Sequence, residues 1–568
     1  MRTNLRKPRL PVRGAIATVA FVLVAVPCLA AVGSEAIEEA RGPANSGAYS
    51  RWKNGPGQDA DFFPIAVWLQ APRNAPRYKA IGVNLYVGLW KGPTAEQIGE
   101  LKQHGVPVIC EQNEYALKHL DEKMIVGWMH GDEPDNAQSL GKGKGYGPPI
   151  PPATIVADYR RIKARDASRP VLLNLGQGVA WDGWHGRGVR TNHPEDYPEY
   201  VRGGDIVSFD IYPAVHNKPA VAGKLWYVAR GVQRLRGWAG ADRIVWNCIE
   251  CTRISNTKTK PTPRQVKAEV WMSIIHGSRG IIYFCHQFKP RFIEAGLLAD
   301  EEMARAVGAI NREIDSLAAV INSPSIQGAV TVTVQPADVA RDMAQLLGSP
   351  GIAVALKKHR GNVYLFAVRM EGRPAKGVFQ TAGLSGEATV RVLGEDRTLI
   401  ARDGRLEDEF GPHGVHLYEI AGAEGNSILS FVPEMEPLPG MDVPENASRW
   451  SDAEKARLSG HVRRATAEWK KQIPGIKSQL TPKRVRSLSR WAKEQMEGYR
   501  IVSDLDKLVL RPWGADANRQ SLLLEGTLDT LPTHSPLVTR WLKVYLMYDL
   551  SSKSLSHIAI TIQGQRLE

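Results

Sequence analysis

The amino-acid sequence predicts an α/β protein, in which a (β/α)8 TIM barrel is followed by an antiparallel β-sandwich and a small C-terminal α+β domain. Three observations support this prediction. Eight short apolar runs alternate with helical segments, a region of alternating apolar and polar residues comes next, and a proline-rich stretch then precedes a basic C-terminal part. The 568 residues are enough for about three or four domains.

Residues 1–36 have the layout of a secretory signal peptide. Five basic residues and no acidic residue stand among the first thirteen, and an apolar run follows from Ala15 to Ala31. The run is short for a membrane-spanning helix and contains Pro27, which favours a cleaved signal over a retained anchor. We therefore expect an exported protein that is secreted or held in the periplasm or cell envelope.

The barrel is expected over residues 55–322. Its predicted strands are nearly continuous apolar runs, as is typical of parallel strands covered on both faces. They are residues 62–70, 82–90, 106–110, 124–130, 170–175, 205–212, 243–249 and 280–288. Capping boxes at 94–97 and 262–265 predict helix starts, and Gly105 predicts a helix end. A doubly wound open sheet is the alternative fold, but no glycine-rich phosphate loop follows the first strand.

The rest of the chain divides into three parts. After a helix predicted over 298–320, residues 325–421 contain the period-2 runs of a β-sandwich. Residues 422–449 form a proline-rich linker. Residues 450–568 form a basic α+β domain of unknown role, with helices opening near 451 and 481 and a terminal hairpin from 541–549 and 555–562.

The net charge of +14 is concentrated at the two ends of the chain. The signal contributes five positive charges, and residues 445–568 carry 21 basic and 13 acidic residues, so the barrel and sandwich are almost neutral. This distribution argues against a nucleic-acid partner and suits an uncharged carbohydrate. The basic stretch 455–500 could contact a membrane or the cell envelope, although a solvated helix face explains it as well.

No cofactor and no metal are expected. Cys110, Cys248, Cys251 and Cys285 lie in apolar runs, and the CxxC that two of them form lacks a second pair of ligands at a suitable spacing for zinc. We expect them to be buried thiols.

Candidate site residues lie at the carboxyl ends of the predicted barrel strands, where the working groups of TIM barrels gather. They combine carboxylates, amides and aromatic rings, a mixture suited to binding sugars. The candidates for substrate binding are Trp68, Tyr86, Trp90, Asp132, Asn174, Asp210, Tyr212, Tyr283 and His286. Packing in the core would explain the aromatic residues and His286 almost as well.

Two glutamates at strand ends suggest a reaction. Glu133 follows the fourth predicted strand and Glu250 ends the seventh, so they could flank a bond held between them. Glycoside hydrolysis requires such a pair of carboxyl groups. An acidic residue after a strand is also an ordinary helix N-terminus, so a capping role for Glu133 stays open.

The segments IVGWMHGDEPDN (125–136) and RIVWNCIECT (243–252) resemble the acid/base and nucleophile segments of clan-A glycoside hydrolases, which are retaining barrel enzymes. The resemblance implies that Glu133 is the general acid/base and Glu250 the nucleophile. FDIYP (209–213) is similar to a segment that presents an aromatic residue to the sugar, and the sandwich looks like an accessory domain of these enzymes. The clan commonly has asparagine where this chain has Asp132.

Three alternatives remain open at this point. Asp210 is the substitute nucleophile if Glu250 points away. The chain could instead be a non-catalytic carbohydrate-binding or surface-assembly protein on a barrel scaffold. A third option is another barrel hydrolase or lyase that uses His286 as its base.

Overall fold

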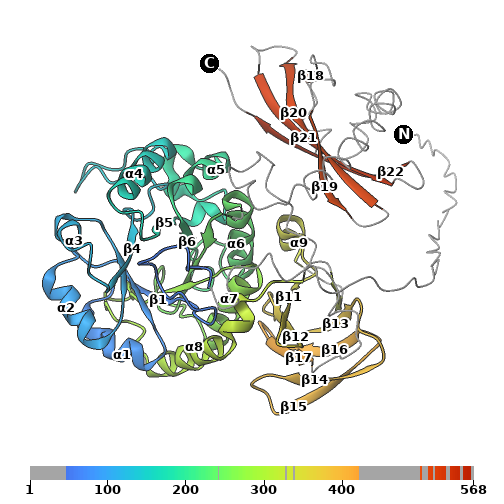
Figure 1. The fold of residues 1–568 in the computed structure, drawn as a ribbon, viewed down its shortest axis with the longest axis horizontal. Coiled ribbons are helices and arrows are strands. Elements are labelled where there is room, and N and C mark those ends of the chain that lie inside the picture. The colour runs from blue at the N-terminus through green and yellow to red at the C-terminus, as the bar shows by residue number, and fades with distance from the viewer. Residues whose placement is uncertain are drawn as a thin grey trace, which may run out of the picture. The chain divides into compact units, whose positions relative to one another are not determined.

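The computed structural model describes residues 47–240, 242–326, 329–336 and 340–420, together with the backbone of five strands between Tyr499 and Gly564 (Figure 1). The predicted signal peptide, the linker and the helices of the basic domain lie outside the described residues. Within the described part, no helix combines the length and the apolar character needed to cross a membrane.

All eight predicted barrel strands are confirmed. They are β1 (Ile65–Trp68), β2 (Leu85–Val87), β3 (Val108–Cys110), β4 (Ile125–Met129), β5 (Val171–Leu175), β6 (Ile206–Phe209), the short β7 (Ile244–Val245) with β8 (Asn247–Glu250), and β9 (Ile281–Phe284). Neighbouring strands run parallel in the order β7-β6-β5-β4-β3-β2-β1-β9-β8. Because β7 pairs with β6 and β8 pairs with β9, the two segments occupy one position and the sheet closes into a barrel.

Helices surround this sheet (Figure 1). They are α1 (Ala75–Ala80), α2 (Ala95–His104), α3 (Glu114–Lys118), α4 (Pro152–Arg165), α5 (Tyr197–Tyr200), α6 (Trp226–Ala239), α7 (Pro263–Ile275) and α8 (Glu301–Asn322), with short 3-10 turns that include η2 (Gln177–Val179), η3 (His185–Arg190) and η4 (Pro194–Asp196). Both predicted capping boxes form, and Gly105 ends α2 in the left-handed conformation.

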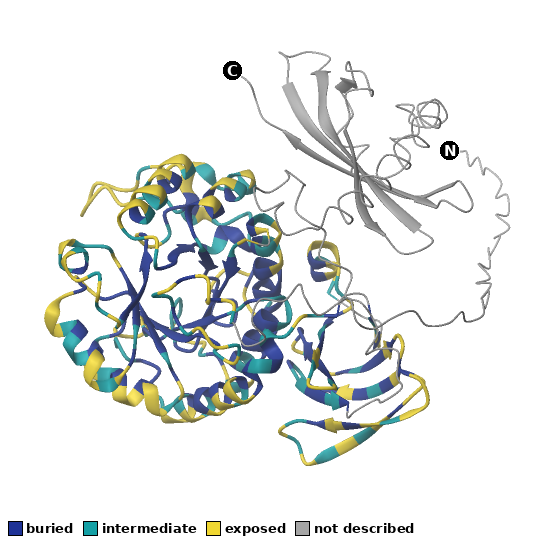
Figure 2. Ribbon diagram, viewed as in Figure 1, coloured by how far each residue is buried: buried dark blue, intermediate teal, exposed yellow. Residues whose placement is uncertain are grey.

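The barrel has two cores, because the side chains of a strand alternate between its two faces. Ala66, Leu85, Leu172 and Ile206 belong to a cluster that contains no residue of α1–α8 and fills the barrel interior. Their neighbours in sequence pack against the helices in a second cluster. Figure 2 shows the strands as the most deeply buried elements, with exposed residues on the outer faces of the helices.

The sandwich follows as eight strands in one antiparallel sheet, in the order β10-β13-β16-β15-β14-β17-β12-β11. The elements are β10 (Val330–Gln335), α9 (Arg341–Leu347), β11 (Ile352–His359), β12 (Asn362–Arg369), β13 (Ala375–Thr381), β14 (Glu387–Val392), β15 (Arg397–Arg402), β16 (Arg405–Phe410) and β17 (Val415–Ile420). The antiparallel topology predicted from the period-2 pattern is confirmed.

The C-terminal part contains β18 (Tyr499–Ile501), β19 (Val509–Ala515), β20 (Arg519–Pro532), β21 (Val538–Asp549) and β22 (Ser554–Gly564). Antiparallel pairing of β21 with β22 confirms the predicted terminal hairpin. In the barrel, Cys110, Cys248, Cys251 and Cys285 are free and buried, as the sequence predicts.

Candidate active site

Two carboxyl groups meet at the carboxyl ends of β4 and β6. Glu133 lies in the turn after β4, and Asp210 directly follows the last residue of β6. Each of these carboxyl groups acts on the pKa of the other. Because two carboxylates at close range repel each other, one member of the pair keeps its proton to a higher pH than the other.

The surroundings indicate which carboxyl group keeps the proton. Burial, and then the charge of Asp210, raise the pKa of Glu133 well above its ordinary value, and the charges of Asp132 and Asp135 add to this effect. Burial also raises the pKa of Asp210, but Glu133 and Tyr212 oppose that rise. These effects favour the protonated form of Glu133, the form that a general acid requires.

Asp132 belongs to a row of polar side chains across three strand ends. Its Oδ1 accepts a hydrogen bond of 2.9 Å from Nδ2 of Asn174, and Oδ1 of Asn174 accepts one of 2.8 Å from Oγ of Ser208. Although Asp132 retains exposed surface, the protein packed around its carboxyl group, together with the charge of Asp210, raises its pKa to about 7. The structure thus brings Asp132, Asn174, Asp210 and Tyr212 together, as we expected.

The backbone of Glu133 is strained. Its φ of +43° lies in the left-handed region, which is unfavourable for a residue with a Cβ by about 1–2 kcal/mol. The turn is closed by hydrogen bonds of 3.0 Å from the Asn136 N–H to the Glu133 carbonyl and 2.9 Å from the Ile150 N–H to the Pro134 carbonyl. Such strain persists only where the surrounding structure holds it, and it is concentrated at functional sites.

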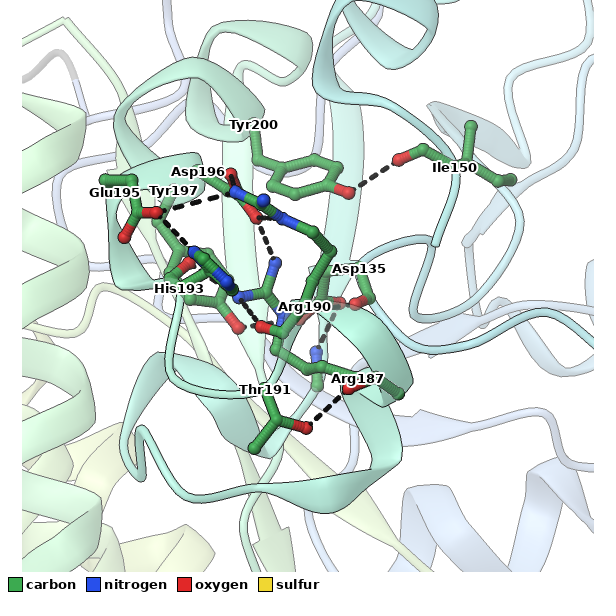
Figure 3. Close-up of polar contacts among 12 residues, drawn as sticks. Asp135, Ile150, Arg187, Arg190, Thr191, His193, Glu195, Asp196, Tyr197 and Tyr200 are labelled. Carbon is green, nitrogen blue, oxygen red and sulfur yellow. Dashed lines mark hydrogen bonds and ion pairs between the residues drawn. The ribbon is translucent and has the colours of Figure 1, made fainter. Parts of the chain in front are cut away.

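A network of buried polar side chains supports this turn (Figure 3). The carboxyl group of Asp135 accepts 2.8 Å hydrogen bonds from the Gly176 N–H and the Tyr197 hydroxyl. Nε of Arg187 donates to the Asp135 carbonyl at 3.2 Å, and its Nη2 forms a 2.7 Å ion pair with Asp196. The sequence analysis missed these residues, although a second acid two positions after Glu133 was a signal that could have pointed to them.

Glu250 lies in a different environment. It is fully buried, its Oε1 accepts a 2.6 Å hydrogen bond from the Ala214 N–H, and its Oε2 accepts one of 2.9 Å from the Val215 N–H. The carboxyl group of Glu269, on α7, also contacts it. Burial raises the pKa of Glu250 to about 7, while these hydrogen bonds act in the opposite direction.

The acids with the largest effects on Glu133 differ from the acid that acts on Glu250. The acids that act on the Glu133 carboxyl group are Asp210, Asp132 and Asp135, whereas Glu269 is the acid that acts on Glu250. The sequence placed Glu250 correctly at a strand end. It did not show that the loop after β6 offers two backbone N–H groups to that carboxylate.

Two of the predicted aromatic ligands face the helices, so the prediction that they line the site is wrong. Tyr86 is fully buried and packs edge-on against Tyr78 of α1, with 6.1 Å between ring centroids. Tyr283 is also fully buried, and its hydroxyl donates a 2.8 Å hydrogen bond to Asn311 of α8. Both belong to the core between strands and helices because alternation along the strand turns them outward.

The remaining predicted residues differ in their exposure and in their contacts. Trp68 lies in the barrel interior, whereas Trp90, in the loop after β2, is 69% exposed. His286 is buried, with Nε2 3.1 Å from the amide nitrogen of Gln70. Tyr212 packs against Phe284 with 5.1 Å between ring centroids.

A second aromatic group lies beside the site and was missed by the sequence analysis. Trp181 and Trp184, in the loop after β5, have ring centroids 6.2 Å apart, and His216 lies 5.7 Å from Trp181. Nε1 of Trp184 donates a 2.9 Å hydrogen bond to Asn136, three residues after Glu133. The segment WDGWHG (181–186) was the signal in the sequence.

No protein-family model and no curated protein matches this chain. Among solved structures, AmyP in complex with maltose aligns at a TM-score of 0.38 and 8% identity, over 64% of this chain and 97% of that one. A GH30 endoxylanase from Clostridium papyrosolvens C71 aligns at 0.35 and 9%, over 67% and 98%. The GH42 β-galactosidase Gan42B from G. stearothermophilus aligns at 0.38 and 8%, over 63% and 98%.

Proposed function

We propose that the barrel is a glycoside hydrolase in which Glu133 is the general acid/base and Asp210 is the carboxylate that acts with it. The positions of these two side chains carry the proposal, because Glu133 in the turn after β4 and Asp210 directly after β6 lie at the end of the barrel where TIM-barrel chemistry occurs, and each acts on the pKa of the other. A bound sugar would lie between them.

The two groups would act in sequence. Glu133 gives its proton to the glycosidic oxygen as the bond to the anomeric carbon breaks, and the bonding electrons leave with that oxygen. The Asp210 carboxylate attacks the anomeric carbon to form a glycosyl ester. Water, deprotonated by Glu133, then displaces Asp210 and restores both groups, so the anomeric configuration is retained. Tyr212 lowers the pKa of Asp210, which supports Asp210 as the ionised partner.

Glu250, the nucleophile implied by the resemblance, has a different role in this proposal. Its oxygens accept from two backbone N–H groups and its side chain is fully buried, so its carboxyl group is held against the loop that follows β6. We propose that Glu250 instead anchors the loop that follows β6, next to Asp210 and Tyr212.

The experiment is a comparison of Glu133→Gln, Asp210→Asn and Glu250→Gln on a panel of aryl glycosides and oligosaccharides. The first two should lower kcat by about 10²–10⁴-fold while keeping the fold. Glu250→Gln should lower Tm and leave kcat within about tenfold of wild type, and azide should restore turnover of aryl glycosides by Asp210→Ala. Binding of oligosaccharides without turnover by the wild-type protein would favour the non-catalytic alternative.

We also propose, from the sequence alone, that the protein is exported and that the basic stretch 455–500 contacts an anionic surface of the cell envelope. Fractionation of the source cells, compared between the full chain and one lacking residues 1–36, tests export. Release of the protein from envelope fractions by salt tests the contact.

A further inference from the structure

The exposed large apolar side chains gather at one end of the barrel. Among the described residues, six of the eight follow the carboxyl ends of barrel strands, and Leu346 and Ile400 are the other two. The six are Trp90 after β2, Leu140 and Tyr146 after β4, Val189 after β5, and Phe288 and Phe292 after β9. Exposed apolar surface concentrated at the active end of an enzyme indicates ligand binding.

Phe288 and Phe292 form the clearest pair in this group. They remain 45% and 60% exposed, their ring centroids are 5.7 Å apart, and their planes are tilted by 36°. The loop that carries them is held as a short hairpin. Gln287 and Ile293 exchange two backbone hydrogen bonds of 2.9 Å, and the Phe288 N–H donates to the Arg253 carbonyl at 3.0 Å. The rings are therefore presented by a structured loop.

Ring contacts connect this pair to the proposed reacting carboxylate. Phe288 lies 6.0 Å from Phe284, and Phe284 lies 5.1 Å from Tyr212, measured between ring centroids. Tyr212 in turn is two residues from Asp210 in the chain, and each of the two acts on the pKa of the other. His286 stacks on Phe292 at 5.8 Å with an interplanar angle of 19°. The row of rings runs from the site of chemistry to the exposed surface.

We propose that Phe288 and Phe292 form a subsite on which one sugar ring of the substrate stacks. The substrate is a glycan several units long, and its reacting bond lies at Glu133 and Asp210. The subsite rests on the proposed function. Pyranose rings offer a face of C–H groups that packs on aromatic rings, and the continuity of the row with Asp210 selects a glycan over other apolar ligands. The exposed Lys289 and Arg291 in the same loop also allow an acidic sugar unit.

The experiment measures binding without turnover. Glu133→Gln protein is titrated calorimetrically with cello-, xylo-, malto- and oligogalacturonide chains of two and six units. We expect at least one series in which the hexamer binds at least tenfold more tightly than the dimer. When Phe288→Ala and Phe292→Ala are added to the Glu133→Gln protein, the hexamer should bind no more tightly than the dimer. Phe292→Trp in the same protein should keep the tighter binding of the hexamer. Leu346→Ala removes a 42% exposed apolar side chain from α9 and should not change the binding of the hexamer.

The outcomes separate this inference from the proposed function. Retained turnover in Glu133→Gln would contradict the proposed reaction, while the binding comparison would still test the subsite. A double Phe variant that binds the hexamer as tightly as its parent would overturn the subsite, as would the absence of length-dependent binding in every series. Self-association that depends on the two Phe residues, measured by sedimentation, would overturn it in favour of a second copy of the chain.

Discussion

Glu133 and Asp210, at the ends of β4 and β6, each act on the pKa of the other, although both are acids. A pair of this kind titrates as a unit, with one proton lost much later than the other. The retained proton supplies the general acid of the proposed reaction. Several measurable consequences follow from the charges around this pair.

Asp210→Asn should shift the pH dependence of the remaining activity. The charge of Asp210 helps to raise the pKa of Glu133, so its removal lowers that pKa and Glu133 loses its proton at a lower pH. The alkaline limb of kcat/KM should therefore move toward acid pH, on top of the loss in rate. A pH–rate profile on an activated aryl glycoside measures the shift, and a limb that moves toward alkaline pH would contradict this view of the pair.

Asp132→Asn should produce a smaller shift in the same direction. Asp132 acts on Glu133 by its charge alone, and this effect ranks below those of burial and Asp210. The asparagine can keep the 2.9 Å contact with Asn174 if one amide flips, so the fold should be preserved. We expect kcat within about tenfold of wild type, since a single polar contact changes while the reacting groups stay. An alkaline limb identical to that of wild type would show that Asp132 has no electrostatic role.

The pair formed by Glu250 and Glu269 should make stability fall as pH rises. Burial raises the pKa of both groups in the folded state, so folding favours their protonated forms. The contribution of these groups to the free energy of unfolding is therefore fully present below the ordinary pKa of glutamate. It is lost as pH rises through about 7, by an amount on the order of 3 kcal/mol for Glu250. Urea unfolding at pH 5.5 and pH 8 measures the difference.

Glu269→Gln supplies the matched control. Its amide can still donate a hydrogen bond to Glu250 but cannot ionise, so the loss of stability between the two pH values should shrink. An unchanged pH dependence in this variant would mean that the buried pair does not control stability in this range.

Arg187→Met should destabilise the barrel and lower kcat together. Arg187 is 1% exposed and binds the Asp135 carbonyl and the Asp196 carboxylate. Its loss leaves the carbonyls of Asp135, Arg190 and His193 without this donor, while Asp196 keeps its ion pair with Arg190. Buried carbonyls left unpaired lower the free energy of unfolding by about 1–3 kcal/mol each. Arg165→Met, the same substitution at an exposed position at the end of α4, should leave both quantities unchanged. A folded Arg187→Met protein with unchanged kcat would show that the network does not position Glu133.

The sequence predicted the barrel well because its signals depend on local structure. Eight apolar runs correspond to the strands, two capping boxes start α2 and α7, and Gly105 ends α2. It was less informative about the site. Whether a strand-end carboxylate points to the barrel mouth depends on neighbouring loops, and the N–H groups of Ala214 and Val215 hold Glu250. Tyr86 and Tyr283 were misplaced because strand ends were considered without the alternation that turns every second residue toward the helices.

The residues in long loops could be predicted least. Trp181, Trp184 and Phe292 lie between barrel strands and helices, where no periodic pattern reports orientation. Asp135 and Arg187 meet across about fifty residues of chain, and only the folded structure shows that contact.

The central claim concerns which carboxylate joins Glu133 in the reaction. It is tested most directly by trapping the enzyme with a 2-deoxy-2-fluoro glycosyl donor of the sugar it accepts, followed by peptide mapping by mass spectrometry. We predict that the glycosyl mass is found on Asp210 and is absent from Asp210→Asn. A label on Glu250 would contradict the pairing of Glu133 with Asp210 and would favour the nucleophile implied by the resemblance.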